Sequence, residues 1–422
     1  MAKLAINGGR PVRDRPFRAY NTIGNEEKAA VKEVLDSGVL SQYLATWSSD
    51  FFGGPKVQEF EAAVANYFGV RNAVTVNSWT SGLVAAVGAI GIEPGDEVIV
   101  TPWTMCATAT AILHWNAIPV FADIDPLTYN LNPDSIEAVI SPQTKAIMVA
   151  DIFGLSADMD RISALASKYG LRVVSDSAQA PGAMYKGKYA GTMADVGGFS
   201  LNYHKHIHTG EGGILVTNDD TIAERLQLIR NHAEAVVSEK GVSNLSNMIG
   251  YNFRLGEIEC AIGVEQLYKL KGLIDYRRKI AEFISNRICQ IDGLNVPFIP
   301  ERCVHVYYIL PLQIKQNFFA VHRDRICQAL QAEGIPVVSS YQNLHLLPLF
   351  QEKIAYGKRG FPWAAPFCKR HISYAKGICP VAEVLNDEIY FGINLASYQF
   401  GIDDALDIIH AFEKVFGQIQ EL

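Results

Sequence analysis

The stretch "GDEVIVTPWTMCATATAILHWNAIPVFADID", residues 95–125, has two short apolar runs on either side of a longer run of small and apolar residues. Residues 95–102 and 118–125 are predicted strands because each is a short apolar run bounded by turn-forming residues, and residues 104–115 are a predicted helix. A helix between two such strands is typical of parallel strands joined by a crossover. The stretch therefore predicts an α/β fold.

The same alternation continues on both sides of this unit. Before it, a predicted helix at 57–68 and a predicted strand at 72–77 precede a helix that begins near Thr80. After it, the predicted elements are strands at 144–154, 171–178 and 212–219 and a helix at 159–170. Strands that alternate with helices of ~10–15 residues predict a mainly parallel sheet flanked by helices.

The alternation of predicted strands and helices ends in the last third of the chain. Residues 254–290 are predicted to be helical, residues 303–314 alternate like a single strand, and residues 402–416 form an amphipathic helical pattern. We therefore predict two domains, a large domain at 1–274 that includes the N-terminal arm and a smaller α+β domain at 275–422.

Composition excludes several functional classes. The chain has 422 residues, 49% hydrophobic content and a net charge of −7, with no basic tract, which argues against a nucleic-acid partner. No apolar run approaches the ~18 residues of a membrane helix, so no membrane partner is expected. The seven cysteines are scattered without a CxxC pair, which favours reduced thiols and a cytoplasmic location.

The segment "VNSWTSGL", residues 76–83, joins a predicted strand to a predicted helix through a polar turn. The first N–H groups of a helix lack internal acceptors, and the helix dipole is positive there, so a phosphate would be stabilised. The hydroxyls of Thr80 and Ser81 would add donors. An ordinary helix N-cap is the alternative interpretation.

Asp176 ends the apolar run of the predicted strand at 171–178. Ligands of parallel α/β sheets bind outside the carboxyl ends of the strands, so this carboxylate is a candidate partner for a cation or a metal. The alternative is a turn-forming or helix-capping aspartate.

The segment "GFSLNYHKHIHTGEGG", residues 198–213, carries Lys205 between His204 and His206, with His208 two residues further on. We predict no metal site, because the segment after the histidines is not strand-like and the chain has no HExxH motif or Cys/His framework. Structural histidines in a polar loop are the alternative interpretation.

Taken together, the three features occur in an order along the chain that indicates one kind of ligand. A helix N-terminus for a phosphate, a strand-end carboxylate and a later lysine are the parts that bind pyridoxal phosphate. The carboxylate would keep the pyridine nitrogen protonated, and the lysine would form the Schiff base.

With these motifs the chain resembles the DegT/StrS family of sugar aminotransferases, which have fold type I. The blocks that carry the resemblance span nearly the whole chain and include residues 53–83, 173–183, 199–213 and 250–270. The resemblance implies a mainly parallel seven-stranded sheet domain and a smaller α+β domain. It also implies a pyridoxal phosphate (PLP/PMP) enzyme that moves an amino group from glutamate or glutamine to a keto group of a nucleotide-linked sugar or a cyclitol.

The family's functional residues correspond to positions in this sequence. The resemblance assigns Lys205 to the Schiff base and Asp176 to the pyridine nitrogen, as the two catalytic residues. It assigns the remaining cofactor contacts to the ring hydroxyl (Gln179), to the phosphate (Thr80, Ser81 and Ser200) and to the phosphate of a neighbouring subunit (Asn252). The last assignment implies a homodimer with shared active sites.

Two positions depart from the family pattern. The residue that usually stacks on the ring is aromatic, whereas Met105 stands there, and Trp103 two residues earlier is the alternative. Trp79 replaces a small residue in the phosphate turn, where it either shapes the substrate pocket or packs away from it. Predicted substrate contacts are His204, His206, His345 and Trp79.

Two other functions come from different classes. Some family members carry histidine in place of the lysine and dehydrate sugars, but this chain has Lys205, which favours amino transfer. A non-catalytic protein that senses the cofactor is a further alternative, although the chain has no DNA-binding segment.

Overall fold

The computed structural model describes residues 2–422 and confirms the predicted α/β fold. A seven-stranded sheet has the order β1-β9-β8-β5-β4-β2-β3, and only β9 runs antiparallel to its neighbours. Its strands are β1 (Asn72–Val76), β2 (Glu97–Val100), β3 (Ile118–Phe121), β4 (Thr144–Ala150), β5 (Arg172–Asp176), β8 (Val196–Ser200) and β9 (Gly213–Thr217).

Apolar side chains cover this sheet on both faces. Along β9, Leu215 belongs to one hydrophobic core, whereas its neighbours Ile214 and Val216 belong to another. Successive residues of a strand point to opposite faces, so both faces of a central strand must be apolar to be buried. The sheet is therefore the middle layer of a three-layer arrangement.

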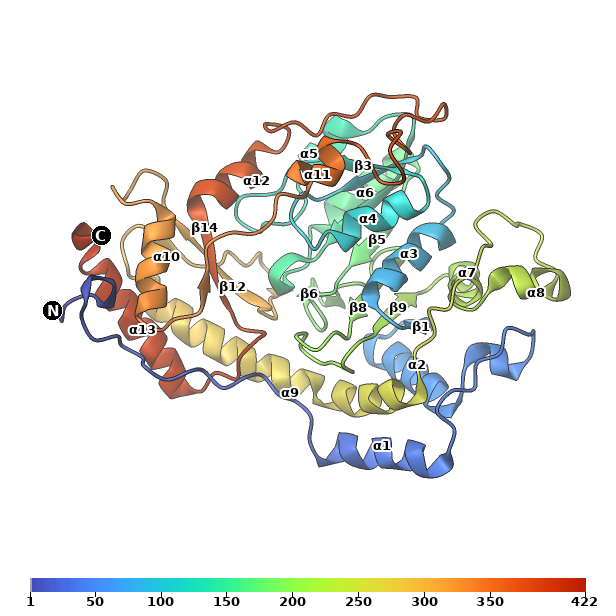
Figure 1. The fold of residues 1–422 in the computed structure, drawn as a ribbon, viewed down its shortest axis with the longest axis horizontal. Coiled ribbons are helices and arrows are strands. Elements are labelled where there is room, and N and C mark those ends of the chain that lie inside the picture. The colour runs from blue at the N-terminus through green and yellow to red at the C-terminus, as the bar shows by residue number, and fades with distance from the viewer. Residues whose placement is uncertain (1) are drawn as a thin grey trace.

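Helices supply the outer layers. On one face α3 (Trp79–Ala89) packs against α4 (Ala107–His114) and α7 (Asp220–Arg230), and on the other α2 (Pro55–Phe68) packs against the long helix α9 (Glu257–Ile288) (Figure 1). The remaining helices are α1 (Asn25–Ser37), α5 (Pro133–Val139), α6 (Met159–Tyr169), α8 (Ala233–Lys240), α10 (Arg323–Ala332), α11 (Pro348–Gln351), α12 (Pro380–Val384) and α13 (Ile402–Phe416).

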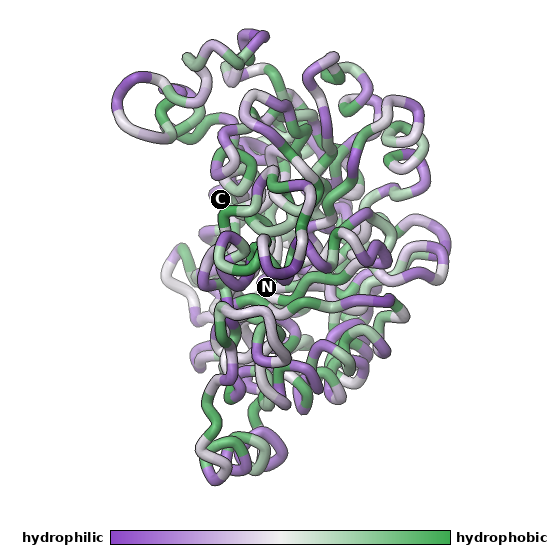
Figure 2. The backbone as a smooth tube through the Cα atoms, turned by 90° about the vertical axis from the view of Figure 1, so that its right-hand side faces the viewer, coloured by the Kyte–Doolittle hydropathy of each residue, from purple (hydrophilic) through white to green (hydrophobic). Residues whose placement is uncertain are grey.

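A second core lies at the other end of α9. It contains an antiparallel sheet with the order β10-β12-β14-β13, packed with α10 and α13. The strands are β10 (Leu294–Asn295), β12 (Ile309–Ile314), β13 (Val337–Val338) and β14 (Tyr390–Asn394). Leu4 is fully buried in this core, which brings the two ends of the chain close together (Figure 2).

The predicted domain boundary, between residues 274 and 275, falls inside α9. The two cores are also interleaved along the chain, since Leu4 packs in the second core whereas Phe350 and Tyr374 pack in the core of the large sheet. The division at residue 274 stays a prediction, and we describe the two parts by their cores.

The single strand predicted for residues 303–314 is wrong, because the structure has two strands there. β11 (Cys303–Val304) pairs with β6 (Met184–Tyr185), which pairs with β7 (Lys188–Tyr189), and β12 belongs to the second sheet. Tyr307 between β11 and β12 has a φ of 52°, which turns the backbone out of the extended conformation. Tyr308 follows this turn, so its side chain is free to face the large domain.

Candidate active site

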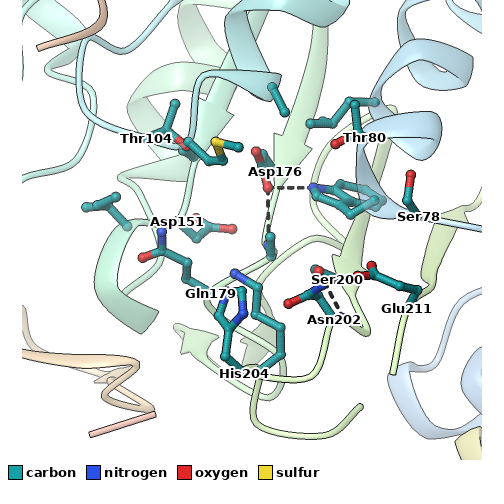
Figure 3. A pocket seen from close by; sticks show the side chains of 18 residues that line it. Ser78, Thr80, Thr104, Asp151, Asp176, Gln179, Ser200, Asn202, His204 and Glu211 are labelled. Atoms are coloured by element: carbon teal, nitrogen blue, oxygen red, sulfur yellow. Dashed lines mark hydrogen bonds between the residues drawn. The ribbon is translucent and has the colours of Figure 1, made fainter. Parts of the chain in front are cut away.

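A pocket lies at the carboxyl edge of the large sheet. It is lined by segments that follow five parallel strands, namely residues 78–83, 104–107, 150–152, 176–179 and 200–211. The carboxyl edge is where parallel α/β sheets bind ligands, because several strand ends and helix N-termini meet there. The pocket includes eight of the predicted site residues: Trp79, Thr80, Met105, Asp176, Gln179, Ser200, His204 and Lys205 (Figure 3).

Lys205 is a buried amine with no ion pair among the described residues. Its side chain follows β8, is 8% exposed, and holds Nζ 4.5 Å from the centre of the Tyr308 ring. Burial lowers the pKa of Lys205 to about 8, while the charge of Asp176 opposes that shift. A lysine with a pKa near the working pH exists partly as the neutral amine, which can act as a nucleophile or a base.

Asp176 is the last residue of β5 and is held by three hydrogen bonds. Trp79 Nε1 donates to Oδ1 at 2.6 Å, Thr108 Oγ1 donates to Oδ2 at 2.6 Å, and the Ala178 N–H donates to Oδ1 at 3.2 Å. An ionised carboxylate has about four acceptor positions, so one remains for a donor on a ligand. The carboxylate is therefore fixed in place and can still accept a further N–H.

Trp79 lines the pocket and is 6% exposed, so it does not pack away from the site. Its ring fits because Gly198 on β8 has no side chain, since a Cβ there would lie 2.5 Å from the ring. The contact between Trp79 and Asp176 joins residues 97 positions apart. The sequence analysis missed this hydrogen bond and the one from Thr108, and no sequence signal marks either donor.

The first turn of α3 faces the pocket. Ser78 is the N-cap, and its Oγ accepts from the Ser81 N–H at 3.1 Å. The Ser81 hydroxyl in turn donates to Asn77 Oδ1 at 2.7 Å, so Ser81 supports the turn, and Thr80 and Ser200 line the pocket. This arrangement fits an anion, because the N–H groups of a first helical turn have no acceptor within the helix.

Two polar residues beside this turn were not anticipated. Asn202 Nδ2 donates to Glu211 Oε1 at 2.8 Å, whereas the buried Oδ1 of Asn202 has no partner among the described residues (Figure 3). A buried carbonyl oxygen without a donor is costly, so this atom is suited to a donor on a ligand.

The structure distinguishes the two candidates for stacking on a ring. Met105 lines the pocket and is 60% exposed. Trp103 is fully buried in the core, where its Nε1 donates to Asn343 Oδ1 at 2.8 Å. Gln179 lies on the same side of the pocket as Asp151 (Figure 3), and its amide is held by the Phe153 N–H and by Tyr341 OH.

The histidines around Lys205 have separate environments. His204 lines the pocket, where burial and the neighbouring charge of Lys205 lower its pKa to about 4. His204 is therefore neutral at physiological pH. His206 is buried outside the pocket, with Nε2 3.0 Å from the Val306 carbonyl oxygen, and burial holds the pKa of His206 well below its usual range. His208 also lies outside the pocket lining.

His206 and His345, the other predicted substrate contacts, both lie outside the pocket lining. His345 is fully buried, and its Nε2 lies 2.8 Å from Glu383 Oε1, outside the pocket lining. Its ring lies 5.9 Å from that of Phe121, so it belongs to the packing between the loop after β13 and the large sheet.

Asn252 also lies outside the pocket of its own chain and is exposed. Its backbone carbonyl accepts from Asn77 Nδ2 at 3.3 Å, and its position remains compatible with a role toward another subunit.

No group of three or more His, Cys, Asp or Glu side chains within residues 2–422 is placed to hold a metal ion. No helix in the same range is both long and apolar enough to cross a membrane.

Comparisons with known proteins agree with this geometry. The DegT/DnrJ/EryC1/StrS aminotransferase family profile matches residues 21–377. The spore coat polysaccharide biosynthesis protein SpsC of Bacillus subtilis is 36% identical over 83% of this chain and 89% of its own length. The L-glutamine:2-deoxy-scyllo-inosose aminotransferase of Streptoalloteichus tenebrarius is 32% identical over 99% of each chain.

Solved structures show the same relationship. The X-ray structure of the aminotransferase from Psychrobacter cryohalolentis superposes with a TM-score of 0.81 at 28% identity, covering 96% of this chain and 100% of the other. The sequence and structural matches extend over nearly the whole chain, and they include the segments that line the pocket. The chain is therefore an enzyme that belongs to the DegT/DnrJ/EryC1/StrS aminotransferase family.

Proposed function

We propose that this enzyme uses pyridoxal phosphate to move an amino group from glutamine or glutamate to a keto group of a sugar or cyclitol. The observation that carries the proposal is Lys205, a buried amine without an ion pair that shares a pocket with a hydrogen-bonded carboxylate, Asp176. Membership of an aminotransferase family supports the reaction class.

The residues of the pocket fit the cofactor. Asp176 keeps one free acceptor position for a ring N–H, and the first turn of α3 with Thr80 and Ser200 suits a phosphate. When bound, the cofactor supplies an electron-accepting ring and a carrier for the amino group. Met105 and Gln179 line the same pocket, and in this proposal Met105 covers one face of the ring while Gln179 contacts the ring hydroxyl.

Lys205 has two tasks in this proposal. Its amine would hold the cofactor and, once released, would take a proton from the donor carbon that bears the nitrogen and give it to the cofactor carbon bonded to the same nitrogen. A pKa of about 8 leaves about a tenth of the lysine neutral at pH 7, against less than about a thousandth for an ordinary lysine. Burial of the side chain therefore gives Lys205 the basicity that the proton transfer needs.

Asp176 stabilises positive charge on the ring nitrogen throughout. Because Trp79 and Thr108 donate to its two oxygens, the carboxylate cannot rotate away from the pocket. Water is largely excluded at this depth, since Asp176 is 5% exposed, and a charge interaction is stronger there than in solvent.

The acceptor class follows from the relatives. SpsC is named for polysaccharide biosynthesis, and the Streptoalloteichus enzyme for amino transfer from L-glutamine to a keto-cyclitol. Both names point to polyhydroxylated ring ketones. Neutral His204 and the Asn202–Glu211 pair are suited to hydrogen-bond hydroxyl groups of such an acceptor.

The test uses the purified protein with glutamine or glutamate and either scyllo-inosose or a nucleotide-linked keto-sugar. We expect one amino product for each 2-oxo acid formed, and a loss of at least about 10³-fold in turnover for Lys205→Ala. The control is Lys188→Ala, which removes an exposed lysine of β7 and should leave turnover unchanged. Full turnover by Lys205→Ala, or a deoxygenated product without consumption of the donor, would contradict amino transfer.

The working unit in this proposal is a homodimer. Asn252 is exposed and lies beside an apolar surface that includes Leu40 and Leu44, which are 50% and 53% exposed. The two leucines are tied to this region because the Leu40 carbonyl accepts from the Glu257 N–H and the Leu44 carbonyl accepts from Asn231, the bridge partner of Asn252. A second copy covering this surface would bring its own Asn252 to the neighbouring pocket.

Mixing two inactive variants tests the shared site. If Asn252 acts across the interface, a mixed dimer of Lys205→Ala and Asn252→Ala chains contains one intact site. We therefore expect the mixture, after subunit exchange, to regain activity that neither variant has alone. If Asn252 acts only within its own chain, no mixed dimer has an intact site, and the absence of recovery despite verified exchange would contradict the proposal.

A further inference from the structure

Arg277 is a buried arginine on α9 whose charge forms no ion pair within residues 2–422. Its side chain is 7% exposed, and neither Nη1 nor Nη2 has a hydrogen-bond partner among the described residues. No carboxylate of residues 2–422 forms an ion pair with it. Its guanidinium carbon lies 4.8 Å from the centre of the Tyr20 ring. Burial lowers the pKa of Arg277, because the charged form is poorly solvated there.

The other buried arginines of the molecule are all paired. Arg13 contacts Asp404 and Asp407 at 2.9 and 2.7 Å, and Arg230 contacts Glu61 at 2.5 Å. Arg323 pairs with Asp324 and also donates to three backbone carbonyls, those of residues 386, 387 and 390. An unpaired buried charge costs several kcal/mol, so proteins pair such charges or bind a ligand to them. Arg277 is the exception within the described chain.

Arg277 is also one of the residues that line a small cavity beside α9. Its walls come from the N-terminal segment at Tyr20, from α9 and from the loop after β14 at Tyr398 and Gln399. The cavity of about 60 Å³ exceeds the ~10–15 Å³ that a single water needs. In Figure 1 the chain before α1 runs along α9 and α13, and it thereby forms one wall of this cavity.

We propose that this cavity binds a small oxyanion, phosphate or carboxylate, through the Arg277 guanidinium. The planar guanidinium presents parallel N–H donors that match two oxygens of either group. The aromatic rings of Tyr20, Tyr398 and Phe400 line part of the cavity, and an anion beside them is less fully solvated than in bulk water, which strengthens its attraction to Arg277. The unpaired charge is thereby compensated only when the ligand is bound.

This anion site is separate from the candidate active site but adjacent to it. The two cavities share no lining residue. One side chain connects them, because Tyr20 packs on Arg277 and donates from its hydroxyl to the backbone carbonyl of His206 at 2.7 Å, directly after Lys205. The proposal does not depend on the reaction that Lys205 performs.

The experiment measures anion binding to the cofactor-loaded enzyme, in which the phosphate contacts at Thr80 and Ser200 are occupied. Thermal unfolding and titration calorimetry follow inorganic phosphate in one arm and acetate in the other, with chloride holding the ionic strength constant. A ligand that binds only the folded state raises the unfolding temperature in a saturable way. We expect this response for at least one anion, and the arm that responds identifies the ligand chemistry.

Variants on the same helix assign the response to Arg277. Arg277→Gln should abolish the response, and Arg277→Lys should weaken the affinity at least about tenfold because the parallel donors are lost. Lys279→Gln removes an exposed charge of α9 and should behave as wild type. A wild-type response retained by Arg277→Gln, or no response to either anion, would overturn the proposal.

A measurement on the wild-type protein decides the question if Arg277→Gln does not fold. Crystals of the enzyme are soaked in selenate, whose anomalous scattering locates a tetrahedral oxyanion directly. We expect a peak within hydrogen-bond distance of the Arg277 terminal nitrogens. A map with selenate elsewhere and none at Arg277 counts against the site.

Discussion

Two regions of the molecule each bury a basic side chain, but they treat its charge in opposite ways. Below β1, Arg230 is fully buried and contacts Glu61, which also accepts from the N–H and the hydroxyl of Thr75. In the candidate active site, Lys205 is buried without an ion pair, and its pKa falls to about 8. The paired arginine joins α7 to α2 and β1, whereas the unpaired lysine is left reactive.

The comparison indicates where in this fold a buried charge lowers stability and provides a reactive group. A buried charge that is paired with an opposite charge fixes a particular arrangement of elements, and removing its partner lowers the stability of the fold. A buried amine without an ion pair destabilises the folded state at neutral pH, and removing that amine lowers the catalytic activity.

The largest effect on stability is expected for Glu61→Ala. The substitution leaves the Arg230 charge buried and unpaired, so the free energy of unfolding should fall by about 3–5 kcal/mol. Denaturant titration measures this loss. Glu59→Ala is the control, because the exposed pair of Glu59 with Lys56 should contribute less than about 1 kcal/mol. Equal effects of the two substitutions would show that the Arg230 network is not special.

Lys205→Met should have the opposite effect on stability. A folded-state pKa of about 8 against an ordinary 10.5 means that the folded chain binds fewer protons than the unfolded chain between these pH values. The unfolding free energy of the cofactor-free protein therefore rises with pH through this window, and Lys205 costs about 3 kcal/mol below it.

Removing the amine should consequently stabilise the cofactor-free protein by up to about 3 kcal/mol at pH 7 while abolishing turnover. The gain over wild type should shrink as the pH approaches about 10. Chemical denaturation at several pH values checks both statements, with Lys188→Met as the exposed-lysine control. A gain that did not change with pH would mean that the lysine is not destabilised by burial.

A smaller change is expected for Trp79→Phe. It keeps most of the ring but removes the N–H that donates to Asp176 Oδ1, so stability should fall by about 2 kcal/mol. The affinity for pyridoxal phosphate should fall with it, because the carboxylate is less firmly oriented. Titration of the cofactor absorbance measures that affinity, and Trp47→Phe, at a site remote from the pocket lining, is the control. An unchanged affinity would argue that Thr108 alone orients Asp176.

The smallest effect is expected for His204→Gln. Because the pKa of His204 is about 4, the ring is already neutral, so the pH profile of kcat/KM between about pH 6 and pH 9 should keep its shape. A loss of one hydrogen bond to the acceptor would raise KM by less than about tenfold. A shift of the acid limb in the variant would contradict this prediction and assign a titration to His204.

The sequence allowed the strand and helix pattern of the large domain to be predicted because each element there has a clear period and clear boundaries. Asp176 could be selected because it lies at the end of a predicted strand, and such ends meet at one edge of a parallel sheet. Lys205 was selected as the lysine that follows it in the chain, and Ser200 through the family resemblance. Residues 303–314 could not be predicted correctly, because their alternation looks continuous while Tyr307 turns the chain between two sheets.

Contacts between segments that are far apart in the chain could not be predicted from the sequence for a different reason. Trp79 meets Asp176 only because Gly198, on a third segment, leaves room for the ring, and the paired His345 lies away from the pocket because Glu383 packs beside it. Such contacts depend on how the helices and strands cross in space, and no periodic pattern in the sequence indicates them.

Local patterns of this chain therefore specify which residues can do chemistry, since turn residues and strand ends are encoded within a few positions. Which charges are satisfied is decided only in the folded molecule. Arg230 and Arg277 are the same residue type in the sequence, yet the first is paired with Glu61, whereas the second has no ion pair among residues 2–422 and lines a small cavity. Burial and pairing depend on segments brought together by the whole fold, because the cost of a buried charge is set by every group around it.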